Sequence, residues 1–74
     1  MAYTREEKVI KKFGANLRKI RKQKGISLEE LAYCAELEYS QVSRIERGII
    51  NTSISQISKI ADALKIPIKD LFDF

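Results

Sequence analysis

Residues Ser27 to Gly48 read SLEELAYCAELEYSQVSRIERG, and this stretch decides the fold. Ser27 followed three residues later by Glu30 forms a capping box, in which each side chain accepts a hydrogen bond from the other residue's main-chain N–H. A second short helical pattern begins near Tyr39, and Gly48 is suited to end it in a left-handed conformation. The apolar face of the first pattern has the three- and four-residue spacing of a helix: Leu28, Leu31, Ala32 and Ala35.

Only residues 36–38 separate the two helical patterns. Two helices joined by about three residues cross at a wide angle, which is the geometry of a helix-turn-helix, so we predict this motif over residues 27–48. Val42, Ile45 and Glu46 form the inner face of its second helix. The outward face is polar and basic, as a DNA-reading helix requires: Tyr39, Ser40, Gln41, Ser43, Arg44 and Arg47.

Apolar periodicity predicts further helices on both sides of this motif. A first helix begins near residues 4–6, where Thr4 can cap it, and Gly25 ends it. Thr52 or Ser53 can cap a fourth helix that ends near Lys65, and a short fifth helix follows Pro67. We therefore predict one all-α, compact, five-helix domain over residues 1–74. The apolar face of the first helix consists of Ile10, Phe13, Leu17 and Ile20.

The formal net charge of the 74-residue chain is +4, and it is unevenly distributed. Residues 1–25 contain nine Lys and Arg against two Glu, which gives +7, whereas residues 26–74 contain five basic and eight acidic residues, which gives −3. A basic first third favours a polyanionic partner, with nucleic acid ahead of a membrane surface. The lysines of the first helix form either a solvated cationic face or phosphate contacts. No apolar run approaches the roughly 20 residues of a membrane span, and no signal-peptide core is present, so a cytoplasmic location is expected.

Residues for catalysis are scarce. The sequence has no His, and Cys34 is its only cysteine, so neither an internal disulfide nor a metal site is expected. We interpret Cys34 as a packing residue, with a redox switch as the weaker alternative. There is no nucleophile with a base and no glycine-rich phosphate loop, so we expect no enzyme activity, no cofactor and no small-molecule ligand.

The central stretch resembles the helix-turn-helix of the Xre/Cro-like phage-repressor family, whose pattern is roughly G-[LI]-[ST]-Q-x-x-L-A, a turn, then I-S-x-[IL]-E-x-G. The family's N-x-S-I and I-A-x-A-L segments also match, at residues 51–54 and 60–64, so the resemblance covers about residues 14–72. The matching positions of the main pattern are Gly25, Ile26, Ser27, Leu31, Ala32, Val42, Ser43, Ile45, Glu46 and Gly48.

The resemblance implies a transcriptional regulator that binds a roughly palindromic double-stranded DNA operator as a homodimer. It implies base reading by Tyr39, Ser40, Gln41 and Arg44. The expected phosphate ligands are Ser27, Ser43, Arg47, Lys22 and Asn51, and the expected dimer contacts, within a tail of about residues 66–74, are Ile68, Leu71, Phe72 and Phe74.

The resemblance also implies an ion pair between Arg21 and Glu46. An inward-facing Glu46 needs such a partner, although two ordinary surface charges are the alternative reading. Leu28 replaces the family's usual glutamine, and Glu36 occupies a turn position often held by glycine, where it would adopt a left-handed conformation.

The biological system is left open by the sequence. A restriction–modification controller, a phage-type repressor and an antitoxin all fit the resemblance. The rival class is a protein-interaction module that uses the same helices to bind a protein partner. The basic first helix and the polar second helix of the motif favour DNA over this alternative.

Overall fold

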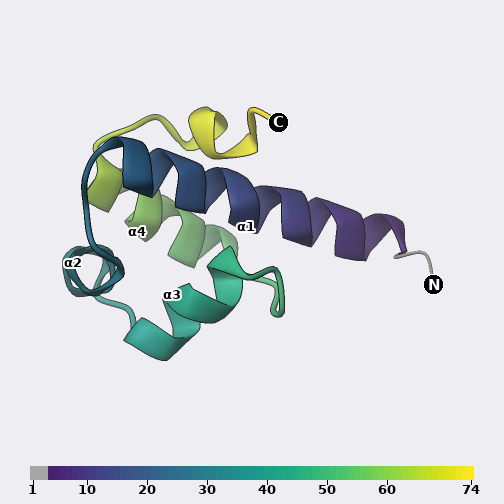
Figure 1. Ribbon diagram of the computed structural model, residues 1–74, viewed down its shortest axis with the longest axis horizontal. Helices are drawn as coiled ribbons and strands as arrows, with labels where there is room; N and C mark the ends of the chain where they lie inside the picture. The colour runs from purple at the N-terminus through teal and green to yellow at the C-terminus, as the bar shows by residue number, and fades with distance from the viewer. Residues whose placement is uncertain (1–3) are drawn as a thin grey trace.

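The computed structural model describes residues 4–74, and it is helical (Figure 1). The described elements are α1 (Arg5–Gln23), α2 (Leu28–Ala35), α3 (Tyr39–Glu46), α4 (Ile54–Leu64) and the 3-10 helix η1 (Ile68–Phe72). Residues 4–74 contain no strand, so the all-α prediction is confirmed. Residues 1–3 of the predicted domain lie outside the described residues.

Side-chain caps begin three of the α-helices, as the sequence predicts. The Thr4 hydroxyl accepts a hydrogen bond from the Glu7 main-chain N–H at 3.1 Å and starts α1. The capping box of Ser27 and Glu30 starts α2. Ser53 starts α4 with a second capping box, in which Gln56 is the partner. These caps pair N–H groups that the first turn of a helix leaves without a partner.

Left-handed residues end α2 and α4 without glycine. Glu36 has φ of 58°, as expected, and Lys65 has the same value. A left-handed conformation costs an L-residue about 1–2 kcal/mol, so each of these turns carries some strain. The chain direction is fixed immediately afterwards, because the Leu37 N–H donates to the Ala32 carbonyl and the Ile66 N–H donates to the Ala61 carbonyl.

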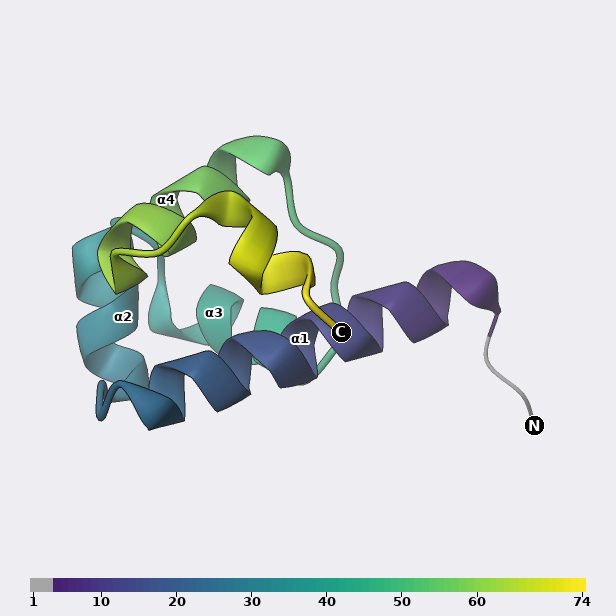
Figure 2. The ribbon, with the colours of Figure 1, turned by 90° about the horizontal axis from the view of Figure 1, so that it is seen from above.

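Around α1, the longest helix, the other elements gather on two sides. In Figures 1 and 2, α2 packs against both α3 and α4, and all three helices lie beside the C-terminal half of α1, while the N-terminal half extends beyond them. The C-terminus returns across the middle of α1 after η1 (Figure 2). The shared core lies between these elements, and it consists of Phe13, Leu17, Leu31, Ala32, Ala35, Val42, Ile45, Ile57, Ile60, Ala61, Leu64 and Leu71.

The C-terminal tail has a short helical element where the sequence predicts a fifth helix, but four α-helices are described and the five-helix count is not confirmed. Its last element is a single 3-10 helix, and Leu71 is 0% exposed within the protomer. Leu71 was expected at a dimer interface, and this is wrong, because the side chain is already covered by α1 and α4. The amide of Asn16 holds the segment in place by donating to the Asp70 and Leu71 carbonyls at 3.0 and 2.9 Å. The Phe13 and Phe72 rings pack with centroids 5.1 Å apart.

The expectation for Cys34 also needs correction. Cys34 is exposed and is not a packing residue, because Leu31, Ala32 and Ala35 occupy the inward positions of α2. In the loop after α3, Ile50 packs against the core whereas Ile49 is exposed.

Candidate nucleic-acid interface

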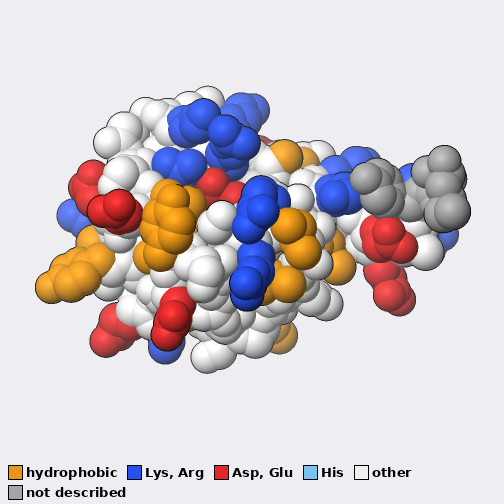
Figure 3. Space-filling view, turned by 60° about the horizontal axis from the view of Figure 1, so that its bottom comes forward, with side chains coloured by type: hydrophobic (Ala, Val, Ile, Leu, Met, Phe, Trp, Pro, Cys, Tyr) orange, Lys and Arg blue, Asp and Glu red, His pale blue; other side chains and the backbone are white. Residues whose placement is uncertain are grey.

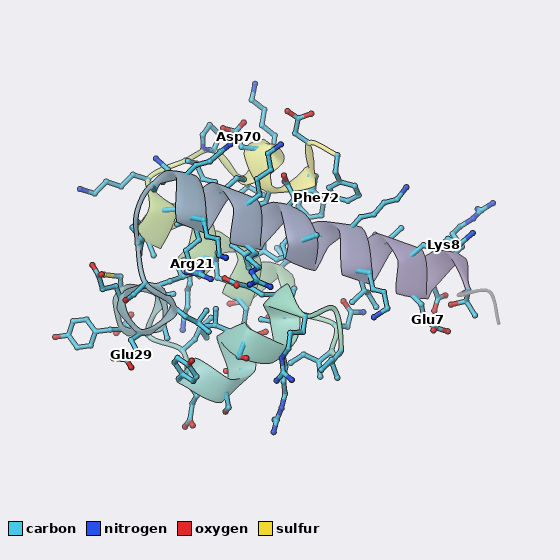
Figure 4. The ribbon with its side chains drawn as sticks, viewed as in Figure 1. Glu7, Lys8, Arg21, Glu29, Asp70 and Phe72 are labelled. Carbon is cyan, nitrogen blue, oxygen red and sulfur yellow. The ribbon has the colours of Figure 1, made fainter. Side chains whose placement is uncertain are left out.

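A bidentate ion pair joins α1 to α3. Arg21 Nε lies 2.7 Å from Glu46 Oε2, and Arg21 Nη2 lies 3.0 Å from Glu46 Oε1. The same guanidinium donates through Nη1 to the Ile26 carbonyl at 3.0 Å, so it also fixes the turn before α2. Figure 4 shows Arg21 extending from α1 into the angle between α2 and α3.

Burial makes this pair important for the fold. The Arg21 and Glu46 side chains are 11% and 5% exposed, so neither charge is fully solvated. The hydrogen bond from Glu46 raises the pKa of Arg21, outweighing the desolvation that lowers it. The expected pair of Arg21 and Glu46 is therefore present, and it sets the crossing of α1 and α3.

Two glycines allow α1 to approach α3 and the loop that follows it. A β-carbon on Gly14 would lie 2.6 Å from the Glu46 carbonyl oxygen, so only glycine fits between the two helices. A β-carbon on Gly48, whose φ is 70°, would lie 2.8 Å from the Lys11 α-carbon. Gly14 is not among the residues singled out from the sequence. A glycine between Phe13 and Leu17, on the apolar face of a predicted helix, nevertheless indicates close packing.

The inner and outer faces of α3 are cleanly separated. Val42, Ile45 and Glu46 are buried against the core and α1. On the opposite face Tyr39 is 54% exposed, and Ser40 and Arg44 are also exposed. Gln41 is half-buried, at the edge of this surface. The four expected base-reading residues thus lie on one helix, with Tyr39, Ser40 and Gln41 in its first turn and Arg44 in its last turn.

The expected phosphate ligands are spread around this surface. Ser27 is exposed, and its oxygen accepts from the Glu30 N–H, so its hydroxyl hydrogen remains able to donate. The Asn51 side-chain oxygen accepts from the Thr52 N–H at 2.8 Å, which leaves its amide NH₂ to meet a ligand. Arg47 Nε donates to the half-buried Ser43's carbonyl at 3.3 Å, which holds Arg47 along α3. Lys22 is exposed on α1.

The N-terminus of α3 differs from those of the other α-helices. Glu38 is its N-cap residue, and it forms no side-chain cap hydrogen bond. The first N–H groups of an α-helix have no partner inside the helix, and here no side chain supplies one by capping. The entry into α3 can therefore present main-chain donors to an anion.

Residues 4–74 contain no group of three or more Cys, Asp, Glu or His side chains arranged to hold a metal ion. Within the same residues, none of the helices combines the length and the apolar character that crossing a bilayer requires.

This arrangement defines a class of protein. Two short helices are joined by a three-residue turn, the second helix is anchored to α1 on its inner side, and its outward face presents hydrogen-bonding and cationic side chains. A scaffold of this kind places its second helix in the DNA major groove. The fold and the surface are those of a helix-turn-helix DNA-binding protein.

Comparison with known families agrees with this class. Residues 16–74 match the model of the Cro/C1-type HTH DNA-binding domain, so the chain belongs to this family. Its relatives are regulators, and the protein is a DNA-binding regulator of the same type.

The relatives with similar sequences include a control protein and a transcriptional regulator. Control protein C.BamHI of Bacillus amyloliquefaciens is 44% identical over 63 residues, which cover 84% of this chain and 78% of the relative. The transcriptional regulator SinR of Bacillus subtilis is 38% identical over 61 residues, which cover 81% of this chain but only 55% of SinR. The crystal structure of the restriction–modification controller C.AhdI from Aeromonas hydrophila superposes with a TM-score of 0.84, at 44% identity, covering 85% of this chain and 96% of that one.

Proposed function

We propose that this protein binds a roughly palindromic DNA operator as a homodimer and regulates transcription from it. The observation that carries the proposal is the outward face of α3, where Tyr39, Ser40 and Arg44 are exposed on a helix anchored by Arg21 and Glu46. One such domain covers about one face of the major groove, and two copies are needed for the contact area of a specific complex.

Base reading is assigned to four residues of α3, from Tyr39 at its start to Arg44 in its last turn. Arg44 has the geometry to bind guanine O6 and N7 together, Gln41 can pair with adenine, and Ser40 can donate or accept. The Tyr39 ring can contact a thymine methyl group. Phosphate contacts are assigned to Ser27, Ser43, Arg47, Lys22 and Asn51, which surround the reading helix.

The dimer contact is assigned to the C-terminal tail. After Leu71 is removed from the expected set, three apolar side chains remain accessible there: Ile68, Phe72 and Phe74 are 44%, 46% and 53% exposed. Symmetric pairing through this tail would place two reading helices about 34 Å apart, which is one turn of DNA.

The relatives favour a role as the controller of a restriction–modification operon. Both C.BamHI and C.MunI are control proteins, and C.AhdI is described as a restriction–modification controller. In this proposal the protein acts in the cytoplasm on the promoter of the operon that encodes it.

Selection of bound sequences from a random duplex pool tests the DNA proposal. The expected result is one motif with two inverted half-sites whose centres are about one helical turn apart. An asymmetric motif would contradict the homodimer, and a pool without enrichment would contradict sequence-specific binding. Binding of the selected motif upstream of the protein's own gene would support the controller role, and its absence there would count against it.

A further inference from the structure

A basic hollow lies between the middle of α1 and the C-terminal end of α3. Its volume is about 530 Å³, and Ala15 contributes a small side chain to its lining. We call it the α1 groove. Its lining residues are Lys11, Ala15, Arg18, Lys19, Lys22, Glu46 and Arg47.

The charge of the α1 groove is almost entirely positive. Glu46 is the carboxylate in its lining, and both oxygens of Glu46 already accept hydrogen bonds from Arg21. Lys19 also borders neighbouring hollows lined by Asp70 and Asp73, so its charge is shared with the C-terminal tail. Arg18, Lys22 and Arg47 face the groove without a compensating carboxylate of the lining.

Arg18 and Lys22 are the cations of the α1 groove that the fold explains least. Both are exposed, and within residues 4–74 neither forms an ion pair. They stand four residues apart on α1, a spacing at which like charges destabilise a helix. Lys22 lies in the last turn of α1, where the helix dipole favours a cation, but the repulsion between the two side chains remains, and an external anion would relieve it.

Charge is also polarised along α3. Glu36 and Glu38 are exposed next to its N-terminal end, so two negative charges lie beside the uncapped N–H groups there. Arg44 and Arg47 lie toward its other end, and Arg47 lines the α1 groove. In Figure 3 the basic side chains over α1 and those along α3 lie on the same face of the molecule.

We propose that the α1 groove binds the sugar-phosphate backbone of the DNA strand that borders the major groove beside the base pairs read by α3. This inference rests on the proposed function and adds Arg18 to its phosphate ligands. A helix in the major groove, which is about 12 Å wide, has a backbone on each side. Because Gly14 brings α1 against α3, the cations of α1 are close to one of those two backbones.

Duplex backbone suits the groove better than a single strand does. Single-stranded nucleic acids are usually held by aromatic side chains on which the bases stack. The lining contains no aromatic residue and consists of flexible cations around a small alanine. Such a lining recognises phosphate charge without selecting a base.

The test compares two doubly substituted variants that lose the same charge. Arg18→Gln with Lys22→Gln removes two of the five cations that line the α1 groove. The matched control is Lys59→Gln with Lys65→Gln, which removes two exposed cations of α4 and its C-cap that lie outside both the groove and the proposed dimer contact. Affinity for the selected operator is measured against salt concentration. Each protein is also tested on operators in which single phosphates outside the read base pairs are replaced by uncharged methylphosphonates.

We expect the groove variant to lose about 1.8 from the slope of log affinity against log salt, since each phosphate contact contributes about 0.9. The methylphosphonates that weaken wild type and the control should leave the groove variant unaffected. If the groove variant matches the control in slope and in phosphate sensitivity, the α1 groove is not a DNA site, while the proposed function stands on the selected operator. If wild type selects no operator, it is the proposed function that fails.

Discussion

Gly14 in α1 lies against the main chain of Glu46 in α3, so closely that a β-carbon on Gly14 would be 2.6 Å from the Glu46 carbonyl oxygen. The position of α3 therefore depends on the lack of a side chain at Gly14 as well as on the ion pair between Arg21 and Glu46. Gly14→Ala should lower the free energy of unfolding by about 1–3 kcal/mol through overpacking, even though alanine favours a helix.

Denaturant melts check this expectation, and Gly25 provides the comparison. Gly25 has φ of 68° and open space around its missing β-carbon, so Gly25→Ala should be destabilising for a conformational reason. Asparagine tolerates the left-handed region and should partly restore stability at position 25 but not at position 14. A Gly14→Ala protein as stable as wild type would show that α1 and α3 are less closely packed than described.

Removing the acidic partner of the buried ion pair should be costly. Glu46→Ala leaves the Arg21 charge in a largely buried site, and the expected loss is about 3 kcal/mol or more. Replacing both residues by well-packed apolar side chains should cost much less, because no charge is then stranded. Thermal melts of the single and double variants measure the difference. A Glu46→Ala protein that melts within a degree or two of wild type would contradict the buried pair.

The C-terminal tail offers a matched pair of substitutions for the dimer. Ile68 is exposed and Leu71 is fully buried, although only two residues separate them. Ile68→Glu should give folded monomers with weakened operator binding, whereas Leu71→Glu should prevent folding, because it buries an unpaired charge. Analytical ultracentrifugation and circular dichroism separate the two outcomes. A folded Ile68→Glu dimer with full operator affinity would exclude this tail as the interface.

Base reading and phosphate binding by α3 should separate in a mutant comparison. Arg44→Ala should cost about 1–3 kcal/mol at one base position and relax the preference there, as loss of a bidentate guanine contact does. Arg47→Ala should weaken all sequences about equally, since Arg47 is held along the helix near its end. Both proteins are profiled against every single-base variant of the operator. A changed base preference in Arg47→Ala with a uniform loss in Arg44→Ala would reverse the two roles.

Much of the scaffold is predictable from the sequence because its signals are local. The capping box at Ser27, the three-residue turn and the left-handed Glu36 each depend on residues close together in the chain, and all are present. The pairing of Arg21 with Glu46 spans 25 residues and was predicted from the family resemblance together with the inward position of Glu46.

Long-range packing explains why some side chains could not be placed from the sequence. Asn16 is polar and would be assigned to the surface, yet it is buried and binds carbonyls 54 and 55 residues later. Those bonds fix how η1 lies on α1, and this placement buries Leu71 while leaving Ile68 exposed. An apolar tail without a helical period does not reveal which of its side chains faces inward.

The outward side chains of α3 contribute little to the interior of the protein. Within residues 4–74, Tyr39, Ser40 and Arg44 form no side-chain hydrogen bonds, and their helix is held in place through Val42, Ile45 and Glu46 on the other side. In the proposed reading of bases by α3, the residues that select the target and the residues that stabilise the fold are therefore different positions of the same eight-residue helix. Regulators that ignore one another's operators can therefore be built on this backbone by exchanging a few surface side chains, which makes it a suitable starting point for orthogonal genetic switches.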